Sequence, residues 1–317
     1  MMTGMTISRA ALSRVGRASK RPSGQSIDRL GSLAAIVLLA ASAATWMAEE
    51  NAIERDAAAG AARNARSGAG VGEAAPSETL VAGYLGSPYT YASNVRLQSP
   101  ADKTDFTMSN VEWRGMPFKS PIYYGVRVAR WGASNRTGVM VDFTHSKAIS
   151  TPTQEVEIKG IIAGAPAPAK EKIGSLFKHL EFSHGHNMLT LNGLFRLGNL
   201  APRLSPYVGI GGGISLPHSE VKLHSEPARS YEYQYTGPVA QALVGLEFRL
   251  AETSVFFEYK FTFADYVAPL SRVDGTWLFM DLARQISAWW RGEKPPGGTL
   301  DTQLISHQLI GGVGYRF

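Results

Sequence analysis

The sequence contains seven histidines, and two of them, His184 and His186, lie two positions apart. In an extended strand, two such residues lie about 6.6 Å apart along the backbone and share one face. Two imidazoles placed in this way can reach one metal ion, which then needs further histidine or carboxylate ligands. The alternative is that a histidine ring, polar at one end, suits the point where a strand leaves an apolar environment.

The segments around these histidines alternate apolar and polar residues with a period of two. In one of them, for example, Phe257 and Tyr259 alternate with Glu258 and Lys260. This period indicates β-strands. The same pattern recurs in eight segments, which are 79–86, 122–131, 138–146, 182–197, 206–217, 241–250, 254–263 and 308–317.

The connections between these segments alternate in length. Short connections span 132–137, 198–203 and 251–253, whereas the long ones span 87–121, 147–180, 219–234 and 267–302. Strands of roughly ten residues, with short turns on one side and long loops on the other, are typical of transmembrane β-barrels. We therefore predict an all-β fold, an eight-stranded antiparallel transmembrane β-barrel with short periplasmic turns and long extracellular loops.

Charged residues fall on the strand face opposite the apolar one. This set contains Arg127, Asp142, Arg196, Glu247, Arg249, Glu258, Lys260 and Arg316. In a membrane barrel, such residues line the interior and pair there, while the apolar face contacts lipid. An eight-stranded barrel is also narrow enough for side chains to fill it, so we expect no water channel.

The carboxyl terminus points to the same location. The chain ends on Phe317, which Tyr315 and Val313 precede at steps of two. This resembles the terminal aromatic pattern of bacterial outer-membrane barrels, which their insertion machinery reads. The sequence thus predicts the bacterial outer membrane as the location and the insertion machinery as a partner.

The amino-terminal region carries most of the net charge. Of the formal charge of +6, residues 1–43 contribute +5, from six Lys and Arg against one Asp. The remainder nets only +1, so a nucleic-acid partner is not expected. An apolar stretch at 33–44 with small residues at 41–43 predicts a signal peptide over 1–43. The alternative is an uncleaved anchor, but a span normally needs about 20 apolar residues.

After the predicted signal peptide, the composition changes twice. Residues 44–78 are rich in Ala, Gly, Arg and Glu, which predicts a flexible low-complexity leader, and the barrel is expected over 79–317. The absence of cysteine excludes a disulfide framework and thiolate chemistry.

With the amino terminus in the periplasm, all seven histidines fall in the outer part of the barrel or its loops. His145 and His218 end the strands predicted beside the histidine pair. We predict His145, His184, His186 and His218 as catalytic residues, with His184 and His186 as metal ligands. By strand parity, His184 and His186 point inward and the other two outward, so a single site would need a bulge at the rim.

A serine hydrolase is the competing chemistry. Each Ser-His pair is adjacent in sequence, as in Ser183/His184, and adjacent strand residues point to opposite faces. We therefore expect no nucleophile-base hydrogen bond within a strand.

The sequence predicts different structures for the second and fourth long loops. Residues 165–172 suggest a mobile segment. Residues 277–294 suggest a helix with Leu278, Leu282, Ile286 and Trp289 near one face. Such a helix would rest on lipid and bind substrate, or it would merely cap the barrel. The predicted substrate-binding residues are Arg284, Trp289, Trp290 and Arg291.

Several stretches together resemble the outer-membrane lipid A oxidase family. They are PIYYGVRVARW, GVMVDFTHSKA, LEFSHGHNMLTLNGLFRL, LSPYVGIGGGISLPHSEV and YQYTGPVAQALVGLEFRL. The resemblance covers roughly residues 79–317. It implies oxidation of the proximal glucosamine of lipid A to 2-aminogluconate, with lipid A in the outer leaflet and dioxygen as partners and hydrogen peroxide as a product.

The sequence contains no flavin or nicotinamide fingerprint. Its glycine run at 209–214 lies within a strand and lacks the following helix of a dinucleotide site. A histidine-bound divalent redox metal is then the simplest remaining device for such an oxidation. Two alternatives stay open: a non-enzymatic small barrel that serves envelope integrity or adhesion, and a lipid A deacylase or acyltransferase.

Overall fold

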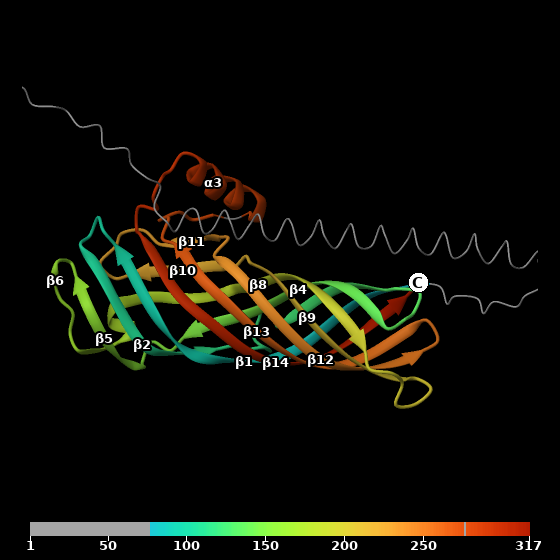
Figure 1. Cartoon of the computed structure of the whole chain (residues 1–317). Coiled ribbons are helices and arrows are strands. Elements are labelled where there is room, and N and C mark those ends of the chain that lie inside the picture. The colour runs from blue at the N-terminus through green and yellow to red at the C-terminus, as the bar shows by residue number, and fades with distance from the viewer. Residues whose placement is uncertain (1–76, 276) are drawn as a thin grey trace, which may run out of the picture.

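The computed structural model describes residues 77–275 and 277–317. The predicted signal peptide and all but the last two residues of the predicted leader lie outside this range. Eight strands form a closed antiparallel ring (Figure 1). In ring order they are β1 (Glu78–Ser99), β3 (Tyr124–Trp131), β4 (Thr137–Ser150), β8 (Phe177–Arg196), β9 (Leu204–Ser215), β12 (Gly237–Leu250), β13 (Thr253–Pro269) and β14 (Thr299–Arg316).

The last strand closes the ring by pairing with the first. The β1–β14 register begins at Leu80↔Arg316 and ends at Gln98↔Thr299, with one irregularity between Thr90 and Val95. Short connections join β3 to β4, β8 to β9 and β12 to β13 at the end where the chain terminates. The predicted eight-stranded antiparallel barrel with short turns at one end is confirmed.

The two faces of the strands divide as the alternation predicts. On β13, Phe257 and Tyr259 are exposed on the outside, whereas Glu258 and Lys260 are buried in the interior. The exposed apolar side chains continue around the ring, as a band facing lipid does in outer-membrane barrels. The barrel is an outer-membrane barrel. No helix among the described residues is long and apolar enough to cross a membrane.

Buried ion pairs fill the middle of the barrel. Arg127 makes two hydrogen bonds to Glu258, at 2.8 and 3.0 Å, and one to Asp142 at 3.2 Å. Lys260 Nζ donates to the other oxygen of Asp142 at 2.6 Å. Tyr84 and Tyr207 donate to the same two carboxylates. The interior is thus packed with paired charges, which desolvation makes costly to leave unpaired.

A second charged group closes the turn end of the barrel. Glu78 accepts from Arg196 at 3.0 Å and also pairs with Arg249 and, at 3.6 Å, with Arg316. Arg196 also donates to Glu247 at 2.8 Å. Glu78 is the first residue of β1. Its carboxylate binds three of the arginines that the sequence predicts in the barrel interior.

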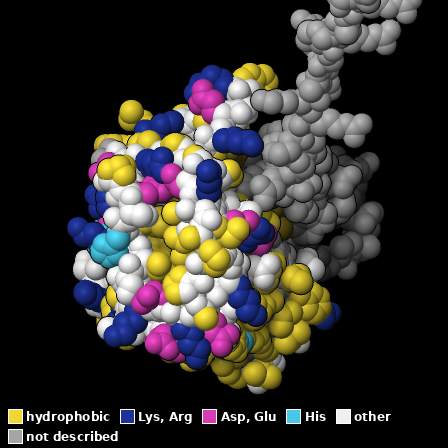
Figure 2. Space-filling view, turned by 90° about the vertical axis from the view of Figure 1, so that its left-hand side faces the viewer, with side chains coloured by type: hydrophobic (Ala, Val, Ile, Leu, Met, Phe, Trp, Pro, Cys, Tyr) yellow, Lys and Arg dark blue, Asp and Glu magenta, His cyan; other side chains and the backbone are white. Residues whose placement is uncertain are grey.

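The opposite end of the molecule is built from ordered sheet. β1, β13 and β14 run on beyond the lipid-facing band, and the added elements are β2 (Thr104–Arg114), β5 (Glu155–Ile162), β6 (Ala165–Pro166), β7 (Lys170–Lys172), α2 (Ile173–Leu176), β10 (His218–Leu223), β11 (Ser230–Tyr233) and α3 (Leu278–Trp290). They surround a second apolar core that includes Phe106, Trp113, Phe182 and Leu300. Figure 2 shows Lys and Arg side chains intermixed with Asp and Glu over this end.

The second long loop departs from the prediction. Residues 165–172 were expected to be mobile, but β6 and β7, which lie at its two ends, both pair with β5. β5 in turn pairs with β2, so this loop continues the sheet of the barrel wall. The prediction is wrong because the backbone groups of the loop find partners on strands that are distant in sequence.

The lipid-facing band can be tested by placing a charge on it. Phe257 lies on the apolar outer face of β13 and is 68% exposed. We expect Phe257→Arg to lower the free energy of unfolding by roughly 2–4 kcal/mol in lipid vesicles, because a charge near the bilayer midplane loses its hydration. Ile161, 47% exposed on β5 outside the band, is the matched control. Equal effects of Phe257→Arg and Ile161→Arg would contradict this placement of the membrane.

The interior network can be tested by a double-mutant cycle. Asp142→Leu leaves Lys260 buried without a carboxylate partner, and we expect it to cost roughly 3–5 kcal/mol of unfolding free energy. Adding Lys260→Met should recover much of this loss, because Arg127 keeps its bonds to Glu258. Urea unfolding in vesicles measures the three variants, and strictly additive effects would refute the coupling.

Candidate functional site

A bulge in β8 lies at the position of the histidine pair. β4 and β8 are in regular register up to Ser146↔His186, and pairing resumes at Ala148↔Phe182. An advance of two residues along β4 therefore corresponds to four residues along β8, so β8 contains two extra residues at this point. Gly185 lies within the bulge with φ +142°, a backbone conformation that L side chains rarely adopt. Bulges re-aim the side chains around them, and this one separates the two histidines.

The two histidines of the pair have different surroundings. The side chain of His184 is 47% exposed, whereas His186 is fully buried. The prediction that both rings share the inward face is wrong, because the bulge turns His184 to the outer side of the wall. The role of the two residues as metal ligands stays a prediction.

His184 packs against the outer face of the β10–β11 hairpin. Its ring lies 5.3 Å from that of His218 and 5.2 Å from that of Tyr231. Its Nδ1 atom lies 3.9 Å from Glu220 Oε2. The register His218↔Tyr233 and Glu220↔Tyr231 places these four residues on one face of the hairpin, so the ladder between β10 and β11 brings aromatic rings and a carboxylate to the histidines.

His145 joins this group from the next strand. Its ring stacks on Tyr124 at 4.9 Å, and its Nδ1 atom lies 2.8 Å from Asn187 Oδ1. It also interacts electrostatically with His184. We refer to His145, His184 and His218 as the outer histidine cluster. Tyr124 is exposed at the end of the lipid-facing face of β3, so the cluster lies at the outer boundary of the membrane.

The surroundings of His218 favour its neutral imidazole. Burial and, to a smaller extent, the neighbouring His184 together lower the pKa of His218 to about 4. His218 Nδ1 and His145 Nε2 make no hydrogen bond with any residue that the structure describes. A neutral imidazole nitrogen with a free lone pair can accept a proton or bind a metal ion. The cluster therefore has the chemistry of a general base or of a metal ligand.

His186 lies on the inner side of the wall, although it also interacts electrostatically with His145. Its Nδ1 atom hydrogen-bonds to the hydroxyl of Tyr266, and both rings belong to the buried interior. Phe182 and Met188, on the same strand, are buried in the apolar core beside it. Of the four predicted catalytic histidines, the fold therefore groups His145, His184 and His218 and places His186 on the inner side.

The bulge also changes the serine–histidine expectation. Ser183 Oγ lies 3.2 Å from His184 Nδ1, so the prediction that no adjacent pair hydrogen-bonds is wrong at this position. The nearest carboxylate, Glu220, approaches the same Nδ1 atom. In a catalytic triad the carboxylate orients the base through its other nitrogen, so this pair lacks the geometry of a triad.

Helix α3 covers the free edge of β11. Asp281 Oδ2 accepts from the backbone N–H of Tyr233 at 3.1 Å, and Gln285 bonds to both backbone groups of Tyr235 at 2.8 Å. Figure 1 shows the helix to the side of the barrel, next to β10 and β11. The helix thus completes an edge that Val273 and Gly275 also cover through the backbone of Tyr231.

The predicted substrate-binding residues of α3 divide between its two faces. Trp289 packs edge-on against Tyr235, and Arg284 bonds to Glu232 and Asp281 at 2.6 Å. Trp290 is 91% exposed, and Arg291 pairs with Glu293.

The exposed apolar side of α3 differs from the predicted one. Ile286 was expected beside Leu278, but it is exposed on the other side, together with Phe279 and Trp290. The exposed apolar residues follow the helical spacing Phe279, Ala283, Ile286 and Trp290. A stripe at this spacing on a helix beside a membrane barrel suits the interface of the outer leaflet.

A polar groove lies on the opposite wall. Its volume is about 530 Å³, and it forms where β1 departs from regular pairing with β14. Its polar lining includes Asn94, Asn110, Asp265 and Gln303. Three strands of the ring separate β14 from β8 on either side, so this groove is remote from the outer histidine cluster.

Sequence reasoning missed Glu220, Tyr231 and Tyr233. All three lie in the third long loop, where the alternation HSEV and SYEY offers a weak signal for two short strands. Their contacts with His184 and His218 depend on the β8–β10 and β10–β11 registers, which no local pattern specifies.

The bulge predicts a large effect of a small substitution. A Cβ at Gly185 would need an unfavourable φ and would lie 2.5 Å from atoms of the Asn187 amide. We expect Gly185→Ala to lower the unfolding free energy by roughly 1–3 kcal/mol, measured by urea unfolding in vesicles. Gly193 on the same strand, whose added Cβ would meet nothing nearer than 3.9 Å, is the control. A Gly185→Ala variant as stable as Gly193→Ala would contradict the strained bulge.

Comparisons with known proteins identify no family. No protein-family model matches the chain, and no curated protein sequence matches it. Among solved structures, it is similar to Neisserial surface protein A, with 10% identity over 76% of this chain and 97% of that chain and a TM-score of 0.32. It is also similar to Ail, the attachment invasion locus protein of Yersinia pestis, with 13% identity over 77% and 99% and a TM-score of 0.31. These values carry no inference about function, and the fold rests on the strand pairing.

Proposed function

We propose that this outer-membrane barrel is an enzyme that oxidises the proximal glucosamine of lipid A to 2-aminogluconate with dioxygen. The observation that carries the proposal is the position of the outer histidine cluster. His145, His184 and His218 lie on the outside of the wall where the lipid-facing band ends. The sugar-phosphate head of lipid A occupies this level of the outer leaflet, so the substrate would reach the cluster without entering the packed barrel.

The reaction balances with dioxygen as the only oxidant. The anomeric carbon of the glucosamine loses two hydrogen atoms, one from the hydroxyl oxygen and one from carbon, and becomes the carbonyl of a lactone. Dioxygen takes up the two electrons and two protons and leaves as hydrogen peroxide. Water then opens the lactone to the acid, and lipid A gains one oxygen atom.

The residues of the cluster suit the proton transfers of this reaction. His184 is half-exposed and is the member that a lipid headgroup can contact directly. His218 has a ring nitrogen, Nδ1, that makes no hydrogen bond with any described residue and is available to accept the hydroxyl proton. Asn187 holds the ring of His145. A divalent redox metal bound by histidine would supply the electron route.

Helix α3 supplies the proposed contact with the lipid body. Its exposed stripe, which ends in Trp290, faces away from β11, while Arg291 extends from the end of the helix. An amphipathic helix in this position buries its apolar stripe at the boundary of the acyl chains. The lipid would thus be held beside the hairpin that carries His218.

A second candidate is a non-enzymatic barrel that serves adhesion or envelope integrity. The ordered sheet of β2, β5 and β6 beyond the membrane favours it, because a rigid and charged outer surface can hold a macromolecular ligand (Figure 2). The barrel interior favours neither candidate, since both need only a packed scaffold.

Mass spectrometry of lipid A separates the candidates. Expression of the chain in a host that lacks it should add one oxygen atom to the sugar backbone, and only under air. We expect His184→Ala and His218→Ala to lower the yield of this product by roughly 100-fold or more, as the loss of a general base does. The control is His224, which lies in the third loop and bonds to the backbone carbonyl of Gly174. His224→Ala should retain activity.

Other outcomes would overturn the proposal. A lost acyl chain would indicate a deacylase that uses Ser183 and His184, and unchanged lipid A would support the non-enzymatic barrel. Full activity of both His184→Ala and His186→Ala would refute the predicted ligand pair. Each variant must first be shown to insert, by protease resistance of the barrel in isolated outer membranes.

A further inference from the structure

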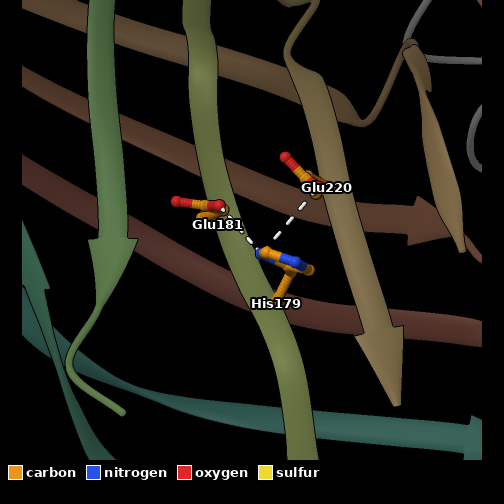
Figure 3. A group of neighbouring side chains, drawn as sticks. All are labelled: His179, Glu181 and Glu220. Atoms are coloured by element: carbon orange, nitrogen blue, oxygen red, sulfur yellow. Dashed lines mark ion pairs between the residues drawn. The ribbon is translucent and has the colours of Figure 1, made fainter. Parts of the chain in front are cut away.

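A group of metal-ligating side chains lies beside the outer histidine cluster. His179 and Glu181 extend from β8, and Glu220 extends from the neighbouring strand β10 (Figure 3). One ligand atom from each residue lies within 4.8 Å of the other two. His179 Nδ1 lies 3.4 Å from Glu181 Oε1 and 3.8 Å from Glu220 Oε1. No other group of three such residues occurs within the described ranges 77–275 and 277–317.

Strand geometry places the three side chains on one face. Leu180 and Val221 are buried in the apolar core, so His179, Glu181 and Glu220 point to the outer side of the wall. Glu220 and Glu181 are direct partners in the β8–β10 register. Two carboxylates opposite each other across a strand pair repel, and a cation between them would remove this repulsion.

Arg229 bonds to the carboxylate of Glu220 but not to that of Glu181. Its Nη1 atom donates to Glu220 Oε1 at 2.7 Å, and its Nε atom donates to Asp274 at 2.8 Å. The guanidinium also lies 4.0 Å above the ring of Tyr231. Carboxylates that bind metals are commonly held by such an outer hydrogen bond.

We propose that His179, Glu181 and Glu220 bind a divalent transition-metal cation of the Zn²⁺ class. An imidazole with two carboxylates selects such a cation, because Ca²⁺ and Mg²⁺ prefer oxygen ligands alone. His184 Nδ1, 3.9 Å from the second oxygen of Glu220, is within reach as a further ligand. His179 and His184 are partly exposed, so the cation would keep positions open to a phosphate or sugar oxygen at the membrane surface.

This site differs from the predicted pair His184 and His186, and it does not depend on the proposed oxidation. None of its three residues belongs to the site predicted from the sequence. His186 lies on the inner side of the bulge. The metal-ligating group on the outer side consists of His179, Glu181 and Glu220.

Isothermal titration calorimetry of the folded full chain in detergent micelles tests the site. After treatment with chelator and dialysis, we expect Zn²⁺ to bind saturably at one equivalent, and Ca²⁺ to bind far more weakly. His179→Ala and Glu181→Gln should each weaken Zn²⁺ binding by more than the roughly 10–100-fold typical of outer-partner substitutions, because each removes a ligand. Both side chains are partly exposed, so the barrel should fold in either variant.

His307→Gln is the matched control, since it removes a histidine from β14 on the opposite wall, where Tyr91 and Tyr259 contact it. It should bind Zn²⁺ as the unmodified chain does. Absence of saturable Zn²⁺ binding to the unmodified chain, or unchanged binding by His179→Ala and Glu181→Gln, would refute the site. The titration contains no lipid A, so its failure would leave the proposed oxidation standing, and loss of oxidation with intact Zn²⁺ binding would leave the metal site standing.

Discussion

The pairing of β14 with β1 is the contact on which the rest of the structure depends. A sheet that crosses a membrane has no water to satisfy an open edge, so the ring must close. Closure through the register from Leu80↔Arg316 to Gln98↔Thr299 gives every strand an inner and an outer face. The charged residues can then enter the molecule only as mutual partners, as Arg127, Asp142, Glu258 and Lys260 do. This rigid, sealed interior leaves the outer wall and the extracellular sheet as the surfaces for function.

The outer wall becomes chemically distinctive at one irregularity of the ring. The bulge at Gly185 turns His184 outward, where it meets His218 and lies near Glu220. A regular strand would have placed His184 inside with His186. A local departure from strand geometry therefore assembles a polar site on a surface that is otherwise apolar. Such bulges are frequent beside functional sites because they re-aim single side chains.

The hairpin of β10 and β11 extends this site and creates a second constraint. Its outer strand lies at the edge of the sheet. Val273 and Gly275 pair with the backbone of Tyr231, and α3 bonds to that of Tyr233 and Tyr235 through Asp281 and Gln285. The side of the helix that makes these contacts packs against the protein. The remaining side, with Phe279, Ile286 and Trp290, is left apolar and exposed. The same helix thus stabilises the hairpin and presents an exposed apolar stripe on its other side.

The sequence by itself determined the barrel, its strand number and the assignment of each face. A period of two is a local property, and lipid and packed charges select opposite faces at every step, so residues such as Phe257 and Lys260 reveal their sides without tertiary information. It also placed the histidines at the outer end, because their order along the strands sets their depth in the membrane.

Only the tertiary structure decided which of these residues meet. The bulge in β8, the β8–β10 register and the exposed side of α3 depend on pairing between segments far apart in sequence. A shift of one residue reverses every side chain of a strand. For this reason the inward position of His184 and the mobile second loop were predicted wrongly, and the group of His179, Glu181 and Glu220 emerged only when the strands were paired.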